Sequence, residues 1–218
     1  MVEISASLLS MKNENAIQTL YNLETAGIHY FHIDVMDGKF VKRNTVDKML
    51  EYCEYINSIS NLPLDVHLMV EDVKTYIDSF LVFEPNRITI HLEAAKSKEQ
   101  LLEWIQYIKE NNAKVGVSIK PNTKVEEIYE YLPFIHQILV MTVEPGEGGQ
   151  ALIPETISKI QQLHEYITSH NLEVDIEADG GIKVENIESL KQAGIDIAVV
   201  GSGITDTKDF KKTVSKLI

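Results

Sequence analysis

The sequence predicts a closed (β/α)8 barrel, the TIM-barrel class, formed by residues 1–218 as a single domain. Eight short apolar segments alternate with amphipathic ones along the whole chain, and no linker or change of composition divides them. Near-continuously apolar strands that alternate with helices are typical of parallel sheets covered on both faces. Eight such units suit a closed barrel. An open, doubly wound sheet is the alternative, but it would carry GxGxxG after the first strand, where this chain has SASLLS.

The eight predicted strands are short runs of apolar residues. The first, EISAS, begins almost at the N-terminus, and the last ends in VVG. Their number is the reason for preferring a closed barrel to an open sheet. The strands are predicted at residues 3–7, 29–35, 62–68, 86–92, 113–119, 137–143, 173–178 and 196–201.

About eight helices are expected between the strands, in strict β–α order. The clearest patterns have apolar residues three and four positions apart, as on one face of an amphipathic helix. Glycine or asparagine closes several of them, as at Gly27 and Asn111. These patterns cover residues 16–27, 73–83, 101–112 and 157–170.

Composition and charge exclude several classes of function. Hydrophobic residues make up 44% and charged residues 24%, which is ordinary for a soluble globular protein. The net charge of −13 argues against nucleic acid or an anionic membrane as a partner, so local donors must bind any anionic substrate. No apolar run is long enough to span a bilayer, and the N-terminus lacks a basic signal segment. The one cysteine, Cys53, is predicted to be a buried or half-buried structural thiol, which fits a reducing cytoplasm.

Two histidines and two carboxylates stand at the ends of three predicted strands. His32 and Asp34 are two residues apart on one strand, so both side chains point to the same face. His67 ends the next strand, and Asp179 ends the seventh. Inward carboxylates are costly unless they are paired or bind a cation. The residues therefore predict a divalent-metal site whose ligands suit Zn²⁺, with Fe²⁺, Mn²⁺ and Co²⁺ as alternatives.

Glycine-rich loops follow the last three strands. They read PGEGGQ at 145–150, ADGGI after the seventh strand and VVGSGI after the eighth. Barrels often bind phosphate after strands seven and eight through loop amides and the start of a short helix. Gly180–Gly181 and Gly201–Ser202 stand at those two places, and PGEGGQ adds a further cradle. Loop amides bind an anion without lysine or arginine, as the acidic chain requires.

Three methionines and two acidic residues near the strand ends are expected to have structural or supporting roles. Met36, Met69 and Met141 fall there, but methionine usually fills cores. Glu93, after the fourth strand, is expected to have a supporting rather than a catalytic role. Asp37 is expected to shape the loop after the second strand, as a turn or cap residue.

Seven segments together resemble the ribulose-phosphate 3-epimerase family over nearly the whole chain. Their order is highly specific to that family and its near relatives. The resemblance implies a barrel that epimerises C3 of a pentulose 5-phosphate and assembles into a homo-oligomer. The segments are SASLLS at 5–10, HIDVMDGKFV at 32–41, DVHLMV at 65–70, HLEA at 91–94, VMTVEPGEGGQ at 140–150, EADGGI at 177–182 and VVGSGI at 199–204.

The resemblance also implies a role for each site residue. His32, Asp34, His67 and Asp179 would hold the metal, and the two aspartates would be the paired acid and base. Inversion at C3 needs such groups on both faces, while the metal would stabilise the enediolate as a Lewis acid. The substrate-binding residues would be Ser7, His67, Met36, Met69, Met141, Gly146, Glu147, Gly148, Gly149, Gly180, Gly181, Gly201 and Ser202.

Two departures from the family pattern bear on the substrate. Lys42 stands where the family usually has proline, and Glu147 stands where it usually has phenylalanine. The metal ligands and the acid–base pair are retained, so the departures question the substrate more than the reaction. The expected substrate pair is D-ribulose 5-phosphate and D-xylulose 5-phosphate. The alternative is D-allulose 6-phosphate or the substrate of another sugar-phosphate epimerase of the same family.

Two functions of other classes rank below epimerisation. A decarboxylase of the orotidine-phosphate type needs a DxKxxD array, and the second strand here ends in DVMDG without that lysine. A non-catalytic sugar-phosphate sensor would be expected to have lost a ligand or an acid, and none is lost.

Overall fold

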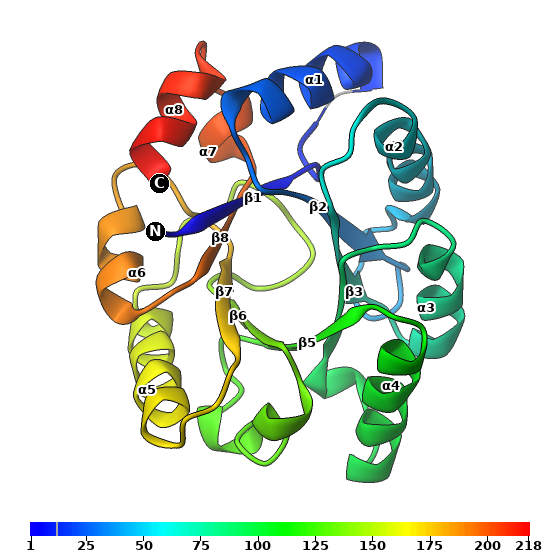
Figure 1. Ribbon diagram of the computed structural model, residues 1–218, viewed down its shortest axis with the longest axis vertical. Coiled ribbons are helices and arrows are strands. Elements are labelled where there is room, and N and C mark those ends of the chain that lie inside the picture. Colours follow the sequence, from blue (N-terminus) through cyan, green and yellow to red (C-terminus); the bar gives the residue numbers. More distant parts are fainter. Residues whose placement is uncertain (12) are drawn as a thin grey trace.

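The computed structural model describes residues 1–11 and 13–218 and confirms the predicted barrel. Eight parallel strands pair in chain order, and β8 pairs with β1 to close the sheet (Figure 1). Each strand lies within two residues of its expected bounds. The strands are β1 Glu3–Ser7, β2 Tyr30–Met36, β3 Leu64–Met69, β4 Arg87–His91, β5 Lys114–Ile119, β6 Gln137–Met141, β7 Asp175–Asp179 and β8 Ile197–Val200.

The α-helices surround the ring of strands (Figure 1). All four of the clearest helical patterns in the sequence are helices here, with small differences at their ends. The helices are α1 Ala16–Ala26, α2 Val46–Ile59, α3 Val73–Leu81, α4 Lys98–Glu110, α5 Glu155–Ser169, α6 Ile187–Ala193, α7 Ser202–Thr205 and α8 Phe210–Leu217.

The expectation of strict β–α order is wrong between β5 and β6. There the chain forms two short 3-10 turns, η3 (Val125–Glu127) and η4 (Leu132–Phe134), and no α-helix. Pro133 lies inside η4 and lacks the amide donor that a helix running into it would need. Two helices follow β8 instead, α7 and α8.

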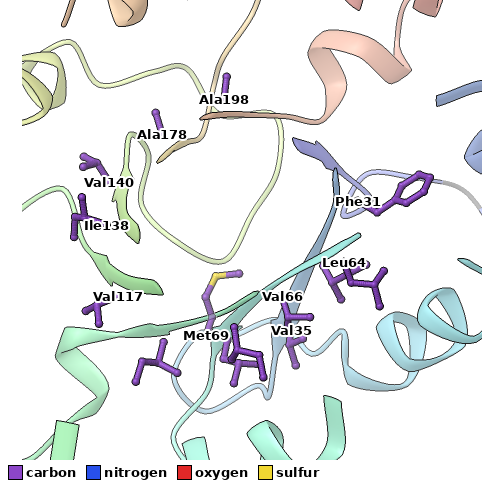
Figure 2. Packing of buried hydrophobic residues seen from close by; sticks show 14 of the residues in the cluster. Phe31, Val35, Leu64, Val66, Met69, Val117, Ile138, Val140, Ala178 and Ala198 are labelled. Carbon is purple, nitrogen blue, oxygen red and sulfur yellow. The ribbon is translucent and has the colours of Figure 1, made fainter. Parts of the chain in front are cut away.

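The main hydrophobic core lies between the strands and the helices. Successive side chains of a strand point to opposite faces, and one set points outward into this layer. Figure 2 shows Phe31, Val66, Ile138 and Ala198 pointing away from the centre of the ring, and all four are buried. The strands therefore carry their apolar face on the outside of the barrel.

The inward face of the strands carries many buried polar side chains. Hydrogen bonds join side chains of strands that are not neighbours, such as Ser5 on β1 with Asp65 on β3, so these groups meet inside the barrel. The barrel interior thus holds a polar network with the predicted site at one end. Its buried members include Ser5, Ser7, His32, Asp34, Asp65, His67, Arg87, Thr89, His91, Gln137 and Glu177.

Two further predictions concern the membrane and Cys53. Among the described residues, no helix is both long and apolar enough to cross a membrane. Cys53 is buried in α2, as expected, and burial raises the pKa of its thiol to about 12. A thiol with so high a pKa is not a nucleophile at neutral pH.

Candidate active site

One pocket at the carboxyl ends of the strands gathers most of the predicted site residues. The loops after β6, β7 and β8 form much of its wall. His32 and His67 are fully buried and do not line the pocket themselves. They lie beside Asp34 and Asp179, which do. The predicted residues that line the pocket are Ser7, Asp34, Met36, Met69, Met141, Gly146, Glu147, Gly148, Gly149, Asp179, Gly180, Gly181, Gly201 and Ser202.

The four predicted metal ligands form one compact cluster. His32 Nε2 lies 3.4 Å from Asp34 Oδ1 and 3.8 Å from Asp179 Oδ2. His67 Nδ1 lies 3.4 Å and 3.7 Å from the same two oxygens. Because β2 pairs with β3 in a register that places Asp34 beside His67, neighbouring strands bring these side chains together. One potential ligand atom from each residue lies within 4.8 Å of the others.

The donor set of this cluster fits a divalent cation. His32 Nε2 and His67 Nδ1 are buried and have no hydrogen-bond partner among the described residues. A buried polar atom without a partner is costly and calls for an explanation. A cation between the two nitrogens and the two carboxylates would give both nitrogens a partner. Two imidazoles and two carboxylates suit Zn²⁺, and Fe²⁺, Mn²⁺ and Co²⁺ accept similar ligands.

Burial and charge give the two aspartates different proton affinities. Burial and the negative charge of Asp34 raise the pKa of Asp179 to about 6. Burial opposes ionisation of Asp34 too, but the positive charges of His32 and His67 hold the pKa of Asp34 well below its ordinary value. Paired groups with separated pKa values are typical of acid–base sites. The cluster therefore offers one strongly ionised carboxylate beside another that takes up a proton more readily.

Neighbouring carboxylates also raise the proton affinity of His32. Burial disfavours its charged form, yet Asp34 and Asp65 raise the pKa of His32 well above its ordinary value. The cluster thus favours positive charge at its centre. A bound metal ion would supply that charge in place of a proton.

Ser7 and the three methionines surround the aspartates. Ser7 Oγ donates a hydrogen bond of 2.8 Å to Asp34 Oδ2, which orients that carboxylate. Met36, Met69 and Met141 line the pocket and are almost fully buried. They give the pocket an apolar wall without adding another acid or base.

The glycine loops approach one another closely on the other side of the pocket. Gly181 has a φ of +67°, and a Cβ atom there would lie 2.3 Å from the backbone nitrogen of Leu152. Only glycine fits such a backbone without displacement. In the loop after β6, the Gln150 amide donates to the carbonyls of Glu144 (2.7 Å) and Glu147 (2.9 Å). These loops bring the glycines of the predicted anion cradle to one pocket.

The two departures from the family pattern lie close to this cradle. Glu147 lines the pocket itself and also a neighbouring groove of about 360 Å³. Lys42 lines the same groove, together with Arg43 and Lys120. Both altered side chains therefore stand at the mouth of the candidate active site.

A network beneath the cluster was missed in the sequence. Asp65 Oδ2 lies 2.7 Å from His32 Nδ1 and accepts a 2.7 Å hydrogen bond from Ser5 Oγ. Glu177, also fully buried, accepts a hydrogen bond from Gln137. Burial and the charge of Asp65 raise the pKa of Glu177 well above its ordinary value. Asp65 and Glu177 each stand two residues before a predicted ligand, and this spacing could have revealed them.

His91 was also passed over, as one of several ordinary histidines. It is fully buried, and its Nε2 lies 3.0 Å from His67 Nε2. Its Nδ1 lies 3.0 Å from Glu93 Oε2, so Glu93 supports the site from behind, as expected. Asp37 accepts hydrogen bonds from the backbone amides of Lys39, Phe40 and Glu71, which confirms its role in shaping the loop.

Solved structures with the same architecture include enzymes of other activities. A 3-hexulose-6-phosphate synthase has a TM-score of 0.72 at 12% identity, covering 99% of this chain and 98% of the other. KGPDC from Streptococcus mutans has a TM-score of 0.73 at 12% identity, covering 100% and 95%. At this identity the likeness concerns the fold alone.

Sequence comparison is far more specific. The chain matches the ribulose-phosphate 3 epimerase family over residues 3–205. A ribulose-phosphate 3-epimerase of Methanocaldococcus jannaschii is 36% identical over 217 residues, covering 100% of this chain and 90% of the relative. One of Escherichia coli strain K12 is 34% identical over 218 residues, covering 98% and 93%. These relatives confirm the predicted enzyme class, an isomerase that epimerises a carbohydrate, and the chain belongs to the ribulose-phosphate 3-epimerase family.

Proposed function

We propose that the protein interconverts D-ribulose 5-phosphate and D-xylulose 5-phosphate by moving a proton at C3. The observation that carries the proposal is the meeting of Asp34 and Asp179, from β2 and β7, at the same two histidine nitrogens. His32, Asp34, His67 and Asp179 would hold a divalent metal ion, with Zn²⁺ as the first choice. The names of the relatives support the substrate pair.

The chemistry needs two proton-transfer groups and a stabiliser of negative charge. A base must take the C3 proton on one face while an acid delivers a proton on the other. Asp34 and Asp179 come from different sides of the barrel mouth and would serve these two roles, which exchange when the reaction reverses. The bound metal would supply Lewis acidity that stabilises the charge developing beside C3.

Other residues would hold the substrate for this transfer. The amides of Gly180–Gly181 and Gly201–Ser202, with the loop 146–149, would bind the phosphate end. Met36, Met69 and Met141 would keep water from the planar intermediate. Ser7, which orients Asp34, would also contact the sugar.

A direct comparison of two substrates tests this proposal. The ratio kcat/KM of metal-loaded protein would be measured on D-ribulose 5-phosphate and on D-allulose 6-phosphate. We expect a clear preference for the pentulose phosphate. The hexulose phosphate is the second candidate because Lys42 and Glu147 both line the groove at the mouth of the site. A preference for it would keep the mechanism and assign the specificity to those two side chains, whereas turnover of neither would reject the proposal.

A further inference from the structure

Three buried or half-buried side chains form a line of hydrogen bonds that ends at the metal cluster. His67 Nε2 lies 3.0 Å from His91 Nε2, and His91 Nδ1 lies 3.0 Å from Glu93 Oε2. The other ring nitrogen of His67, Nδ1, faces Asp34 and Asp179. We call Glu93, His91 and His67 the histidine relay.

The far end of the relay has a fixed hydrogen-bonding direction. Glu93 Oε1 accepts a 2.7 Å hydrogen bond from the backbone amide of Lys120 and another from the Thr123 hydroxyl. A backbone amide can only donate, so an acceptor must stand at this position. Burial opposes ionisation of Glu93, but its hydrogen bonds with His91, Lys120 and Thr123 lower the pKa of this carboxyl to about 2. An ionised carboxylate has only acceptor oxygens, so Oε2 accepts a hydrogen bond from His91 Nδ1–H.

The position of the proton on His91 then determines the tautomer of His67. With its proton on Nδ1, a neutral His91 presents a lone pair at Nε2. Only one proton fits between the two Nε2 atoms, so it must belong to His67. With Nε2 of His67 protonated, the lone pair of its neutral ring is at Nδ1, directed toward the two aspartates.

We propose that Glu93 is a positioning residue that fixes the tautomer of His67 through His91 and so keeps His67 Nδ1 available to a cation. The inference rests on the proposed function in one respect, namely that a metal ion occupies the cluster. Ligand histidines commonly donate their second N–H to a carboxylate, which His32 does directly with Asp65. For His67 the carboxylate of Glu93 acts indirectly, through the imidazole of His91.

The isosteric variant Glu93→Gln should reverse the tautomers of both His91 and His67. The amide oxygen of the glutamine must stay where Lys120 and Thr123 donate, so its NH₂ group faces His91 Nδ1. His91 must then accept at Nδ1 and carry its proton on Nε2, which leaves Nε2 of His67 as an acceptor. The proton of a neutral His67 would therefore move to Nδ1 and block the cation.

Nitrogen NMR of the histidine rings in metal-free protein tests the inference without any activity measurement. In the unaltered protein we expect His91 protonated at Nδ1 only and His67 protonated at Nε2. In Glu93→Gln we expect the proton of His91 at Nε2 and none at Nε2 of His67. The opposite tautomer of His91 in the unaltered protein, or an unchanged tautomer in the variant, would overturn the inference.

Zn²⁺ affinity, measured by competition with a chromogenic chelator, gives the second readout. We expect Glu93→Gln to bind Zn²⁺ about 10- to 100-fold more weakly. Glu127→Gln is the matched control, because it removes the same charge from a nearby exposed residue outside the relay, and its Zn²⁺ affinity should be unchanged. Circular dichroism would show that both variants are folded.

The two readouts separate this inference from the proposed function. If the tautomers are as expected but neither pentulose nor hexulose phosphate is turned over, the relay stands and the proposed function fails. If the enzyme is active but Glu93→Gln leaves the tautomers and the Zn²⁺ affinity unchanged, the relay fails alone.

Discussion

Asp34 and Asp179 come from β2 and β7, which are not neighbours in the barrel, yet both lie within 4 Å of His32 Nε2. Two carboxylates in such proximity, one buried and the other partly buried, repel each other, and this repulsion contributes to the raised pKa of Asp179. The arrangement is stable only if positive charge lies between them. It therefore supports a metal role and a proton-transfer role for the same two residues.

Replacing either aspartate should abolish turnover. Asp34→Asn and Asp179→Asn each remove a proton-transfer group and a metal ligand, so we expect kcat/KM to fall by at least about 10³-fold. Asp175→Asn is the control, because Asp175 begins the strand that Asp179 ends, and its activity should stay near normal. Near-normal activity in either site variant, with folding verified by circular dichroism, would contradict the mechanism.

Removing the metal should stop the reaction reversibly. Protein treated with a chelator is expected to lose activity and to regain it with Zn²⁺ or another of the candidate ions. His32→Gln, which removes one imidazole ligand, should weaken Zn²⁺ binding by an order of magnitude or more, as judged by chelator competition. Full activity in chelator-treated protein shown to be metal-free by elemental analysis would remove the metal from the mechanism.

The barrel could be predicted because its outward strand faces and its helices are governed by local apolar patterns. The same holds for His32, Asp34, His67 and Asp179, since strand alternation brings them to one face. The secondary structure between β5 and β6 was harder to predict, because Pro133 interrupts a stretch whose apolar residues otherwise suit a helix.

The buried network was not predicted because its role depends on contacts between side chains of different strands. Asp65 and Glu177 read as single acids within apolar strands, and the pairing of β2 with β3 and of β6 with β7 brings them beside His32 and Gln137. His91 could not be told from the other histidines, since its importance depends on its 3.0 Å contact with His67. Pairings of this kind depend on strand register. A sequence pattern predicts which face of the sheet a side chain lies on, but not which residue of the neighbouring strand lies beside it.

Two glycine substitutions should separate substrate binding from folding. At Gly201 a Cβ atom would make only ordinary contacts, 3.5 Å from Ser7 Cβ, so Gly201→Ala should fold normally. Because Gly201 lines the pocket, we expect the methyl group to hinder the phosphate and to raise KM about 10-fold. Gly181→Ala places its Cβ against the backbone of Leu152 and should lower the melting temperature instead. Equal effects of both variants on stability would contradict this division.

Glu147 is expected to weaken substrate binding by its charge. It lines the pocket beside the glycines that would bind phosphate. Glu147→Gln removes that charge, so KM should fall by about two- to fivefold at low ionic strength, with kcat nearly unchanged. The difference should shrink in about 0.5 M salt, which screens exposed charges. A higher KM in the variant would show that Glu147 helps to hold the substrate.

Lys159 should make the stability of the protein depend on pH in the mildly alkaline range. Its Nζ donates to the carbonyls of Lys120 (2.7 Å) and Pro121 (3.1 Å), and burial lowers its pKa to about 8. The unfolded chain keeps a pKa near 10.5, so between these values the unfolded state binds more protons and the free energy of unfolding rises with pH.

The comparison with Lys159→Met isolates this effect. From about pH 7 to about pH 9.5, the native protein should gain about 1 kcal/mol relative to the variant, a figure reduced for the partial exposure of the amine. The pKa of Tyr30 is raised to about 12 by burial and its hydrogen bond to Glu3, so its opposing contribution begins only above about pH 10. Chemical denaturation at both pH values measures the difference. A constant difference would mean that Lys159 stays protonated in the folded protein throughout this range.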